Sequence, residues 1–357
     1  MRIPHLRATS GELLTLDFLR FYASAAIVVQ HSHEFLWPMN VRGEIIEKTH
    51  GLALFVDLFF LISGFVIGHL YSGKVGTPKH FGRFMQRRIG RLYPLHLLTF
   101  VLAIAMWALV SSFAKPEHVP SRDPACMALT AAMLHAVFPC GNGNYFNGVN
   151  WSISAEMVMY AIFPLLSAFA LGARRLFLAL SLALFAAILA SVGTLDDWTQ
   201  LYAPLRALPA FGLGLALNAN RDLLLRVRFA NLVMWLSLLG ATACALVGAP
   251  VVIQLPLFYL AGFAATAIDV QGIANPVVTR IAPLGQLTYS IYLWHGFFIA
   301  VLVNAIGDKL LGGKLFAVAP LLAVCYAAIL VWSYLSWRYF ETPARRWIDG
   351  LFGGRGI

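Results

Sequence analysis

The first residues whose types and spacing suggest chemistry lie in one apolar stretch near the N-terminus, LDFLRFYASAAIVVQHSHEF. Arg20 and His31 are eleven residues apart, which on an α-helix places them on one face, roughly 16 Å from each other. Asp17 and Ser24 fall on the same face, so the pattern predicts a narrow polar stripe on an otherwise apolar helix. Because ionisable groups are costly inside a bilayer, such a stripe is typical of a helix that lines a functional site.

His31 is the candidate catalytic residue of this stripe. An imidazole can accept the proton of a hydroxyl group near neutral pH, or it can carry an acyl group for part of the reaction. Asp17 and Arg20 lie three residues apart near the start of the helix, where they can pair. A structural ion pair and a role in supporting His31 both remain open for them.

The second signal is a basic cluster in KHFGRFMQRRIGRLYPLH, which contains Arg83, Arg87, Arg88 and Arg91. In a helix Arg87 and Arg91 are one turn apart, and planar guanidinium groups bind phosphate well, including the phosphates of a nucleotide-bearing cofactor. The alternative is a positively charged stretch that fixes membrane orientation and contacts lipid headgroups. The cluster is the candidate cofactor-binding site.

Two later stretches each align polar side chains on one helix face. NWSISAEMVMY places Ser152, Glu156 and Tyr160 at four-residue spacing, and LTYSIYLWH brings Tyr292 and His295 together at a spacing of three. These five residues are candidates to bind or support a sugar-like acceptor. A solvated Glu156 near the membrane surface and a purely structural His295, hydrogen-bonded to a neighbouring helix, are the alternatives.

The elements that must position these residues are membrane-spanning helices. Of the 357 residues 60% are hydrophobic and only 12% are charged, and the mean hydropathy is +0.75, far too apolar for a soluble domain. We predict an all-α, polytopic membrane protein that forms a single domain over residues 1–357, with no fused soluble domain. The ten predicted spans are 16–37, 51–71, 92–112, 150–172, 176–193, 204–219, 229–248, 250–268, 284–304 and 315–339.

The net charge of +10 follows the membrane topology. With ten spans the basic residues gather in the loops on one side, which predicts that both termini are cytoplasmic. Nucleic acid is not an expected partner, because no basic surface with base-reading groups is apparent. Inside the predicted spans, Asp57 is either buried with a partner or catalytic, and Arg206 either binds an acceptor or snorkels to the membrane surface.

The segment from Cys126 to Pro139 is apolar but too short for a span, so we predict that it is re-entrant or interfacial. Cys126 and Cys140 flank it, and a disulfide between them is an open possibility. No pair of the four cysteines has the spacing of a metal site, so no metal is expected.

These elements, in this order, resemble acyltransferase family 3, the integral membrane acyltransferases that modify bacterial polysaccharides and related acceptors. The resemblance covers nearly the entire chain. Its motifs are Arg20 and His31 with ten residues between them, FFLISGFVI at 59–67, RRIGRLYP at 87–94, NWSISAEMVMY, LGQLTYSIYLWH and the closing WRYFETPARRW.

The resemblance implies an O-acyltransferase of the bacterial inner membrane in which His31 is essential and Arg20 supports it. It also implies that the basic cluster holds an acyl-CoA donor, acetyl-CoA being the commonest. The acceptor would be a carbohydrate, a lipid-linked sugar or a small molecule. The rival hypothesis is a secondary transporter or lipid-sugar flippase, in which His31 relays protons.

Overall fold

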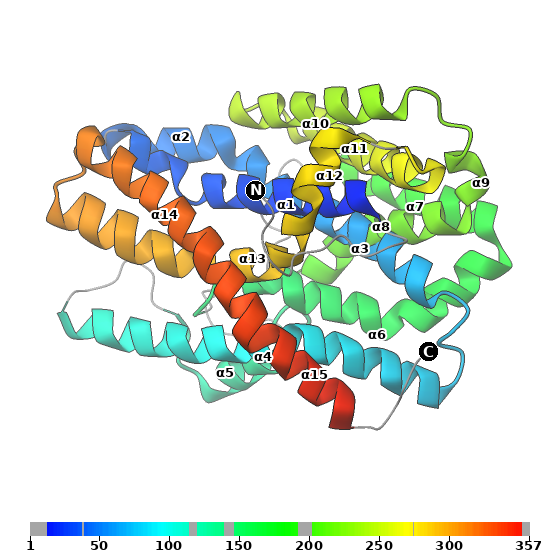
Figure 1. The fold of residues 1–357 in the computed structure, drawn as a ribbon, viewed down its shortest axis with the longest axis horizontal. Coiled ribbons are helices and arrows are strands. Elements are labelled where there is room, and N and C mark those ends of the chain that lie inside the picture. The colour runs from blue at the N-terminus through cyan, green and yellow to red at the C-terminus, as the bar shows by residue number, and fades with distance from the viewer. Residues whose placement is uncertain are drawn as a thin grey trace.

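The computed structural model describes residues 13–37, 39–113, 120–138, 146–191, 202–273 and 275–351, and it is helical throughout, with no strand in those ranges. Many of the long helices run side by side, and α14 crosses them diagonally (Figure 1). The predicted all-α class is confirmed.

The helices of the first half are α1 (Leu14–Gln30), α2 (Arg42–Thr49), α3 (Phe55–Tyr71), α4 (Pro78–Phe113), α5 (Pro124–Ala131), α6 (Asn150–Gly172) and α7 (Arg174–Ser191). Those of the second half are α8 (Ala203–Ala219), α9 (Arg221–Leu224), α10 (Ala230–Leu246), α11 (Val251–Gln271), α12 (Pro276–Ile281), α13 (Thr288–Phe298), α14 (Leu315–Ser336) and α15 (Thr342–Leu351). The short 3-10 helices are η1 (His33–Leu36), η2 (Met39–Val41), η3 (His50–Leu54) and η5 (Ala282–Leu287). Two π-helices are η6 (Ile299–Leu310) and η7 (Trp337–Glu341).

Each of the ten predicted spans coincides with helical structure, and the range 150–172 matches α6. Six helical stretches of the described chain are long and apolar enough to cross a membrane: Arg42–Tyr71, Pro78–Ser112, Asn150–Gly172, Val251–Gln271, Pro276–Leu310 and Leu315–Leu351. The other four predicted spans correspond to α1, α7, α8 and α10, which are 17 or 18 residues long. A polytopic membrane protein is therefore supported, while the number of ten spans stays a prediction.

Helix α3 forms the centre of the fold and packs most extensively against α8. The two backbones approach closely because glycines face each other: a Cβ on Gly64 would lie 2.0 Å from the carbonyl oxygen of Phe211, and one on Gly214 equally close to that of Leu61. Small residues at such crossings are how membrane helices gain contact area where lipid supplies no hydrophobic driving force.

An ion pair between Asp57 and Arg206 joins the same two helices. The Nη2 atom of Arg206 lies 2.6 Å from Oδ2 of Asp57, and each side chain is only 2% exposed. Of the alternatives left open by the sequence, Asp57 is thus buried with a partner. Arg206 is buried and does not snorkel to the membrane surface. Its guanidinium group lies over the ring of Trp151.

Helix α1 is fixed at its first turn by a residue from α11. The backbone N–H groups of Thr15 and Leu16 donate to the carboxylate of Asp269 at 2.8 and 3.0 Å. The first N–H groups of a helix have no partner within it, so this carboxylate satisfies them and complements the helix dipole. Gly285 packs against the backbone of Asp17, the next residue of α1. These contacts fix the position of α1, and with it that of Arg20 and His31, in the bundle.

The basic cluster and the third predicted span form one continuous helix, α4, of 36 residues with Pro94 inside it. The predicted non-spanning segment forms α5, which has eight residues and is too short to cross a membrane. Cys126 is disulfide-bonded, whereas Cys244 and Cys325 are free. Cys140 lies outside the described residues.

Candidate functional site

The first of two neighbouring cavities has a volume of about 210 Å³ and is rich in arginine. We call it the arginine cavity. One face of α3 lines this cavity from Val56 to Tyr71. These two residues lie roughly 22 Å apart along the helix axis. A long, narrow cavity of this kind suits an extended, thin ligand. Its polar lining residues are Arg20, Ser63, Arg88, Arg91, Ser152, Glu156, Tyr160, Thr288, Tyr289, Tyr292 and Arg345.

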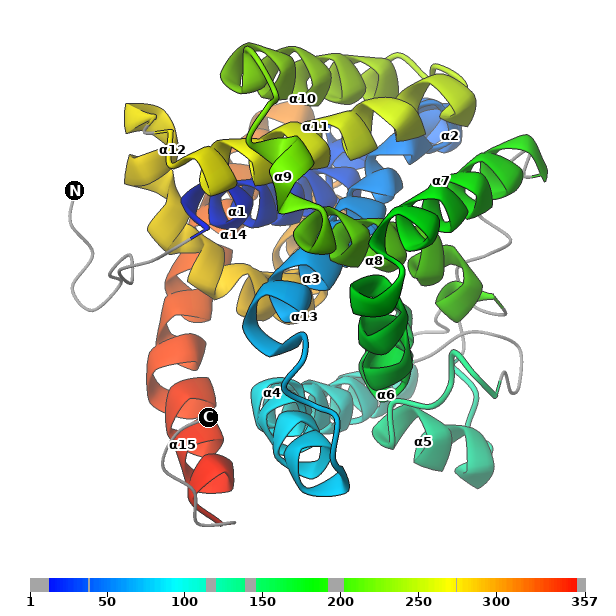
Figure 2. The same cartoon turned by 90° about the vertical axis from the view of Figure 1, so that its right-hand side faces the viewer.

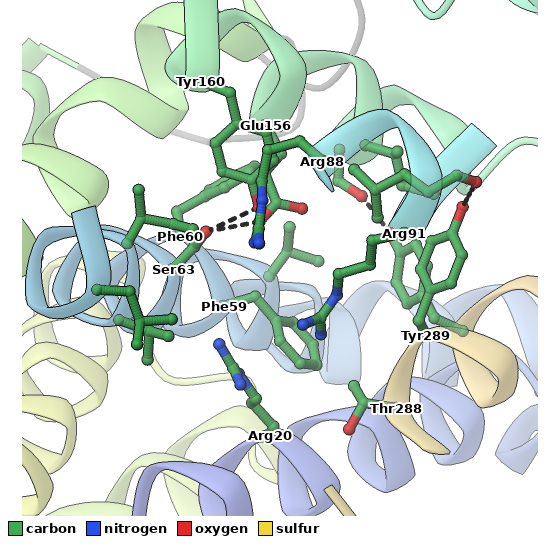
Figure 3. Close-up of a pocket in the computed structure, with 18 of the residues that line it drawn as sticks. Arg20, Phe59, Phe60, Ser63, Arg88, Arg91, Glu156, Tyr160, Thr288 and Tyr289 are labelled. Atoms are coloured by element: carbon green, nitrogen blue, oxygen red, sulfur yellow. Dashed lines mark hydrogen bonds between the residues drawn. The ribbon is translucent and has the colours of Figure 1, made fainter. Parts of the chain in front are cut away.

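Arginine side chains enter the arginine cavity from opposite walls (Figure 3). Arg20 points in from α1, while Arg88 and Arg91 point toward it from α4. Asp17 holds Arg20 through a 3.1 Å contact between its Oδ1 and the Nη1 of Arg20. Asp17 thus acts on the cavity through Arg20, because Asp17 does not itself line the cavity.

Arg88 is the most enclosed of these cations. Its side chain is 5% exposed, and its Nη2 atom donates to the hydroxyl of Tyr71 at 3.2 Å. Its Nε atom is buried and has no hydrogen-bond partner among the described residues. Arg88 lines the arginine cavity, so its positive charge can attract an anionic ligand there.

A compact polar cluster lies opposite Arg88. Both the hydroxyl of Ser63, at 2.6 Å, and that of Tyr160, at 2.5 Å, donate to Oε1 of Glu156. The cluster is visible in Figure 3, where the dashed lines run from Ser63. Glu156 is thus the carboxylate of a cavity that otherwise carries guanidinium groups.

The second cavity, which we call the histidine cavity, is larger, at about 560 Å³. Its lining combines histidines, amides and aromatic side chains, a composition that suits a hydroxyl-rich ligand better than an anion. The polar or aromatic lining residues include Gln30, His31, Glu34, His50, Asn147, Trp151, Tyr292, His295 and Asn304.

His31 and His295 lie together in the histidine cavity, with their ring centroids 5.0 Å apart. The Nδ1 atom of His31 contacts the carbonyl oxygen of Ile27 at 2.9 Å. A carbonyl oxygen can only accept, so Nδ1 carries the proton and Nε2 of the neutral ring keeps its lone pair. His31 is exposed at this cavity. Its Nε2 atom can therefore accept a proton from a ligand there.

The two cavities meet at Tyr292 and Val56, which line both. The hydroxyl of Tyr292 is fixed by the hydroxyl of Ser152 at 2.7 Å and by the carbonyl oxygen of Val149 at 3.1 Å. The ring centroid of His295 is 6.0 Å from that of Tyr292. A group that moves from one cavity to the other must therefore pass Tyr292, close to the two histidines.

The structure thus distributes the predicted site residues between the two cavities. Arg20 and His31 belong to the same polar stripe of α1, but they line different cavities because they lie eleven residues apart. Glu156 and Tyr160, assigned from the sequence to an acceptor, line the arginine cavity and not the histidine cavity. The rotation of α6 about its axis turns this face toward the arginine cavity, and the four-residue spacing places each successive side chain one turn further from Tyr292.

Some predicted residues lie outside both cavities. Arg83 and Arg87 belong to α4 but line neither cavity. Arg87 is nevertheless hydrogen-bonded to Tyr71, which lines the arginine cavity. Sequence reasoning missed Ser63 and Arg345, which line the arginine cavity. Arg345 had a signal, its place in the basic ending WRYFETPARRW, whereas nothing in its local spacing marked Ser63. No cluster of three His, Cys, Asp or Glu side chains that could hold a metal occurs in the described part of the chain.

These features define a class: a helical membrane protein with an arginine-lined cavity and an imidazole-bearing cavity that meet within the bundle. The chain belongs to acyltransferase family 3. The acyltransferase domain of that family matches residues 13–338.

Curated relatives are similar over parts of the chain. The acyltransferase MdmB of Streptomyces mycarofaciens is 29% identical over 43% of this chain and 38% of its own length. The putative membrane-bound transacylase BcsY of Komagataeibacter xylinus is 28% identical over 78% of this chain and 71% of its own. The exopolysaccharide production protein ExoZ of Rhizobium meliloti is 27% identical over 70% of this chain and 77% of its own length. The chain therefore spans less than half of MdmB. No solved structure matches it.

Proposed function

We propose that this protein is a membrane O-acyltransferase. It moves an acyl group, acetyl in the first instance, from acyl-CoA to a hydroxyl of a carbohydrate or lipid-linked sugar. The observation that carries this proposal is the meeting of the two cavities at Tyr292, with arginines on one side and His31 on the other. Membership of the acyltransferase family supports it, as does the name of ExoZ, an exopolysaccharide production protein.

The donor occupies the arginine cavity in this proposal. Arg20, Arg88 and Arg91 bind the phosphates of acyl-CoA, and the pantetheine arm follows the face of α3 toward Tyr292. The thioester then lies beside the histidines. We place the open end of this cavity, with both chain termini, on the cytoplasmic side of a bacterial inner membrane, because acyl-CoA is a cytoplasmic metabolite and the basic residues collect there.

The acceptor occupies the histidine cavity, where Trp151 offers an aromatic face and Gln30 and Glu34 offer polar contacts. Nε2 of His31 removes the hydroxyl proton as the acceptor oxygen attacks the thioester carbonyl. The C–S bond then breaks, and the proton passes to the departing CoA thiolate. In the covalent alternative Nε2 attacks the thioester carbonyl, the C–S bond breaks and CoA leaves as its thiolate. The acceptor oxygen then attacks the acyl-imidazole, the C–N bond breaks, and the hydroxyl proton passes to the CoA thiolate.

Trapping experiments separate these two routes. Purified protein is incubated with acyl-labelled acetyl-CoA without acceptor, quenched and digested. Label on the peptide that carries His31 supports the covalent route, whereas unlabelled peptide together with ternary-complex kinetics supports the general-base route.

The rival class, a secondary transporter or lipid-sugar flippase with His31 as proton relay, is not favoured by the family assignment. Purified protein in detergent tests the proposal against it. With acetyl-CoA and a glycan extract of the host membrane, an acyltransferase releases free CoA in proportion to acylated glycan. If no CoA is released although CoA-binding and folding are intact, the proposal fails.

A further inference from the structure

The C-terminal helix α15 lies beside the first half of α4, at one edge of the bundle (Figure 2). Nε2 of Gln86 donates to the backbone oxygen of Ile348 at 2.7 Å. A Cβ added to Gly90 would lie only 3.2 Å from Cγ2 of Ile348, so the two helices touch closely at this glycine. Helix α15 is thus docked on the helix that carries the basic cluster.

Glu341 holds the turn that delivers α15 to this position. Ser290 on α13 and Ser336 on α14 both donate to its Oε1 atom, the latter at 3.0 Å. A carboxylate bound by two hydroxyls from two other helices fixes the direction in which the chain enters α15. The side chains of α15 are therefore positioned by contacts with the bundle.

One side chain of α15, Arg345, lines the arginine cavity. It is half-exposed, and its nearest acidic neighbour, Asp349, is 3.8 Å away, beyond hydrogen-bond distance. No hydrogen bond to Arg345 occurs within the described part of the chain. Its guanidinium group therefore retains its full set of donors for a ligand.

Arg345 brings the number of guanidinium groups around the cavity to four, with Arg20, Arg88 and Arg91. The one carboxylate of the lining, Glu156, already accepts from Ser63 and Tyr160. Like charges that share a cavity repel one another, so such an arrangement is favourable when an anion with several negative groups is bound. Helix α15 docks on α4 beside Arg88, and Arg88 bonds to Tyr71 at the end of α3 remote from Val56 and Tyr292. Arg345 therefore reaches the cavity at this outer end.

We infer that Arg345 binds the phosphate-bearing nucleotide end of the donor. Helix α15 is then a specificity element that distinguishes CoA thioesters from thioesters without a nucleotide. The inference rests on the proposed function, because it assigns a ligand group to the outer end of the same cavity. Arg345 acts in binding and not in the transfer step, since the reacting thioester lies at the Tyr292 end.

The test compares Arg345→Ala with Arg346→Ala, because Arg346 is the next residue of the same exposed helix and does not line the cavity. We measure the Kd for CoA by calorimetry, and KM and kcat with acetyl-CoA and with acetyl-pantetheine, which lacks all phosphates. Losing one charge-assisted contact predicts a rise of about tenfold in the Kd for CoA and the KM for acetyl-CoA of Arg345→Ala. For Arg345→Ala, kcat and the KM for acetyl-pantetheine stay near their wild-type values. For Arg346→Ala, all of the measured constants do.

Equal constants for the two variants, or an equal rise with both donors, would overturn the inference. Should Arg345→Ala unfold, Arg345→Gln is measured in its place, and the same comparison decides. If wild-type protein neither binds CoA nor uses acetyl-CoA, the proposed function itself fails. If the wild type turns over acetyl-CoA normally and the Arg345 variant has the same constants, only the proposed role of α15 is refuted.

Discussion

The rings of His31 and His295 lie 5.0 Å apart, centroid to centroid, although 264 residues separate them in the chain. Each ring contacts the carbonyl oxygen four residues earlier through Nδ1, His31 that of Ile27 and His295 that of Ile291. The same tautomer therefore applies to both, with Nε2 left as the basic atom of each neutral ring. A pair of helix-anchored imidazoles beside the junction of two cavities is the feature around which the proposed chemistry is built.

Arg88 should matter to donor binding far more than Arg83, although both belong to the basic cluster. Arg88 is 5% exposed and lines the arginine cavity, while Arg83 lines neither cavity. We expect Arg88→Ala to raise the KM for acetyl-CoA about 10- to 100-fold, the cost of one or two charge-assisted hydrogen bonds. Steady-state kinetics measure it, with Arg83→Ala as the matched control. Equal effects of the two substitutions would contradict the assignment of the donor site.

Tyr292 should limit the size of the acyl group. Its ring stands where the two cavities meet, and its hydroxyl is held by Ser152. Replacing it with alanine removes this barrier, so Tyr292→Ala should use butyryl-CoA better, relative to acetyl-CoA, than the wild type does, by roughly tenfold. The ratio of kcat/KM for the two donors measures the effect. Tyr292→Phe keeps the ring and serves as the control, and an unchanged ratio in Tyr292→Ala would exclude a size-limiting role.

The ion pair of Asp57 and Arg206 should stabilise the fold. Both side chains are 2% exposed, so Arg206→Ala leaves a buried carboxylate without its partner, at a cost of about 3–5 kcal/mol. We expect a lower midpoint of thermal unfolding in detergent for Arg206→Ala. The double substitution of both residues should be less harmful than Arg206→Ala alone, because it leaves no unpaired charge. A double variant that is less stable than both single variants would show that the pair does more than neutralise charge.

The sequence predicted the helices well, because apolar runs of about 20 residues have few alternatives to a helix in a membrane protein. It also predicted the polar stripe on α1, since helical spacing alone places Arg20 and His31 on one face. The sequence did not predict which residues far apart in the chain contact each other. The pairing of Asp57 with Arg206 crosses 149 residues of chain, and only the docking of α15 on α4 brings Arg345 to the arginine cavity.

The assignment of Glu156 and Tyr160 shows a second limit of sequence reasoning. Spacing showed that they share one face of α6, but not which cavity that face meets. That choice depends on the rotation of α6 about its axis, which is set by packing against α3 through contacts such as that of Glu156 with Ser63. Rotation of a helix within a bundle is a tertiary property, and local periodicity does not determine it.

The most direct test of the central claim is acyl transfer by His31→Ala, measured as acylated host glycan by mass spectrometry and as CoA release by purified protein. His33→Ala, a nearby histidine that lines neither cavity, is the control. We predict that His31→Ala folds and binds CoA as the wild type does, but transfers the acyl group at least 10²-fold more slowly. Well-folded His31→Ala protein that acylates host glycan at the wild-type rate would contradict the proposal.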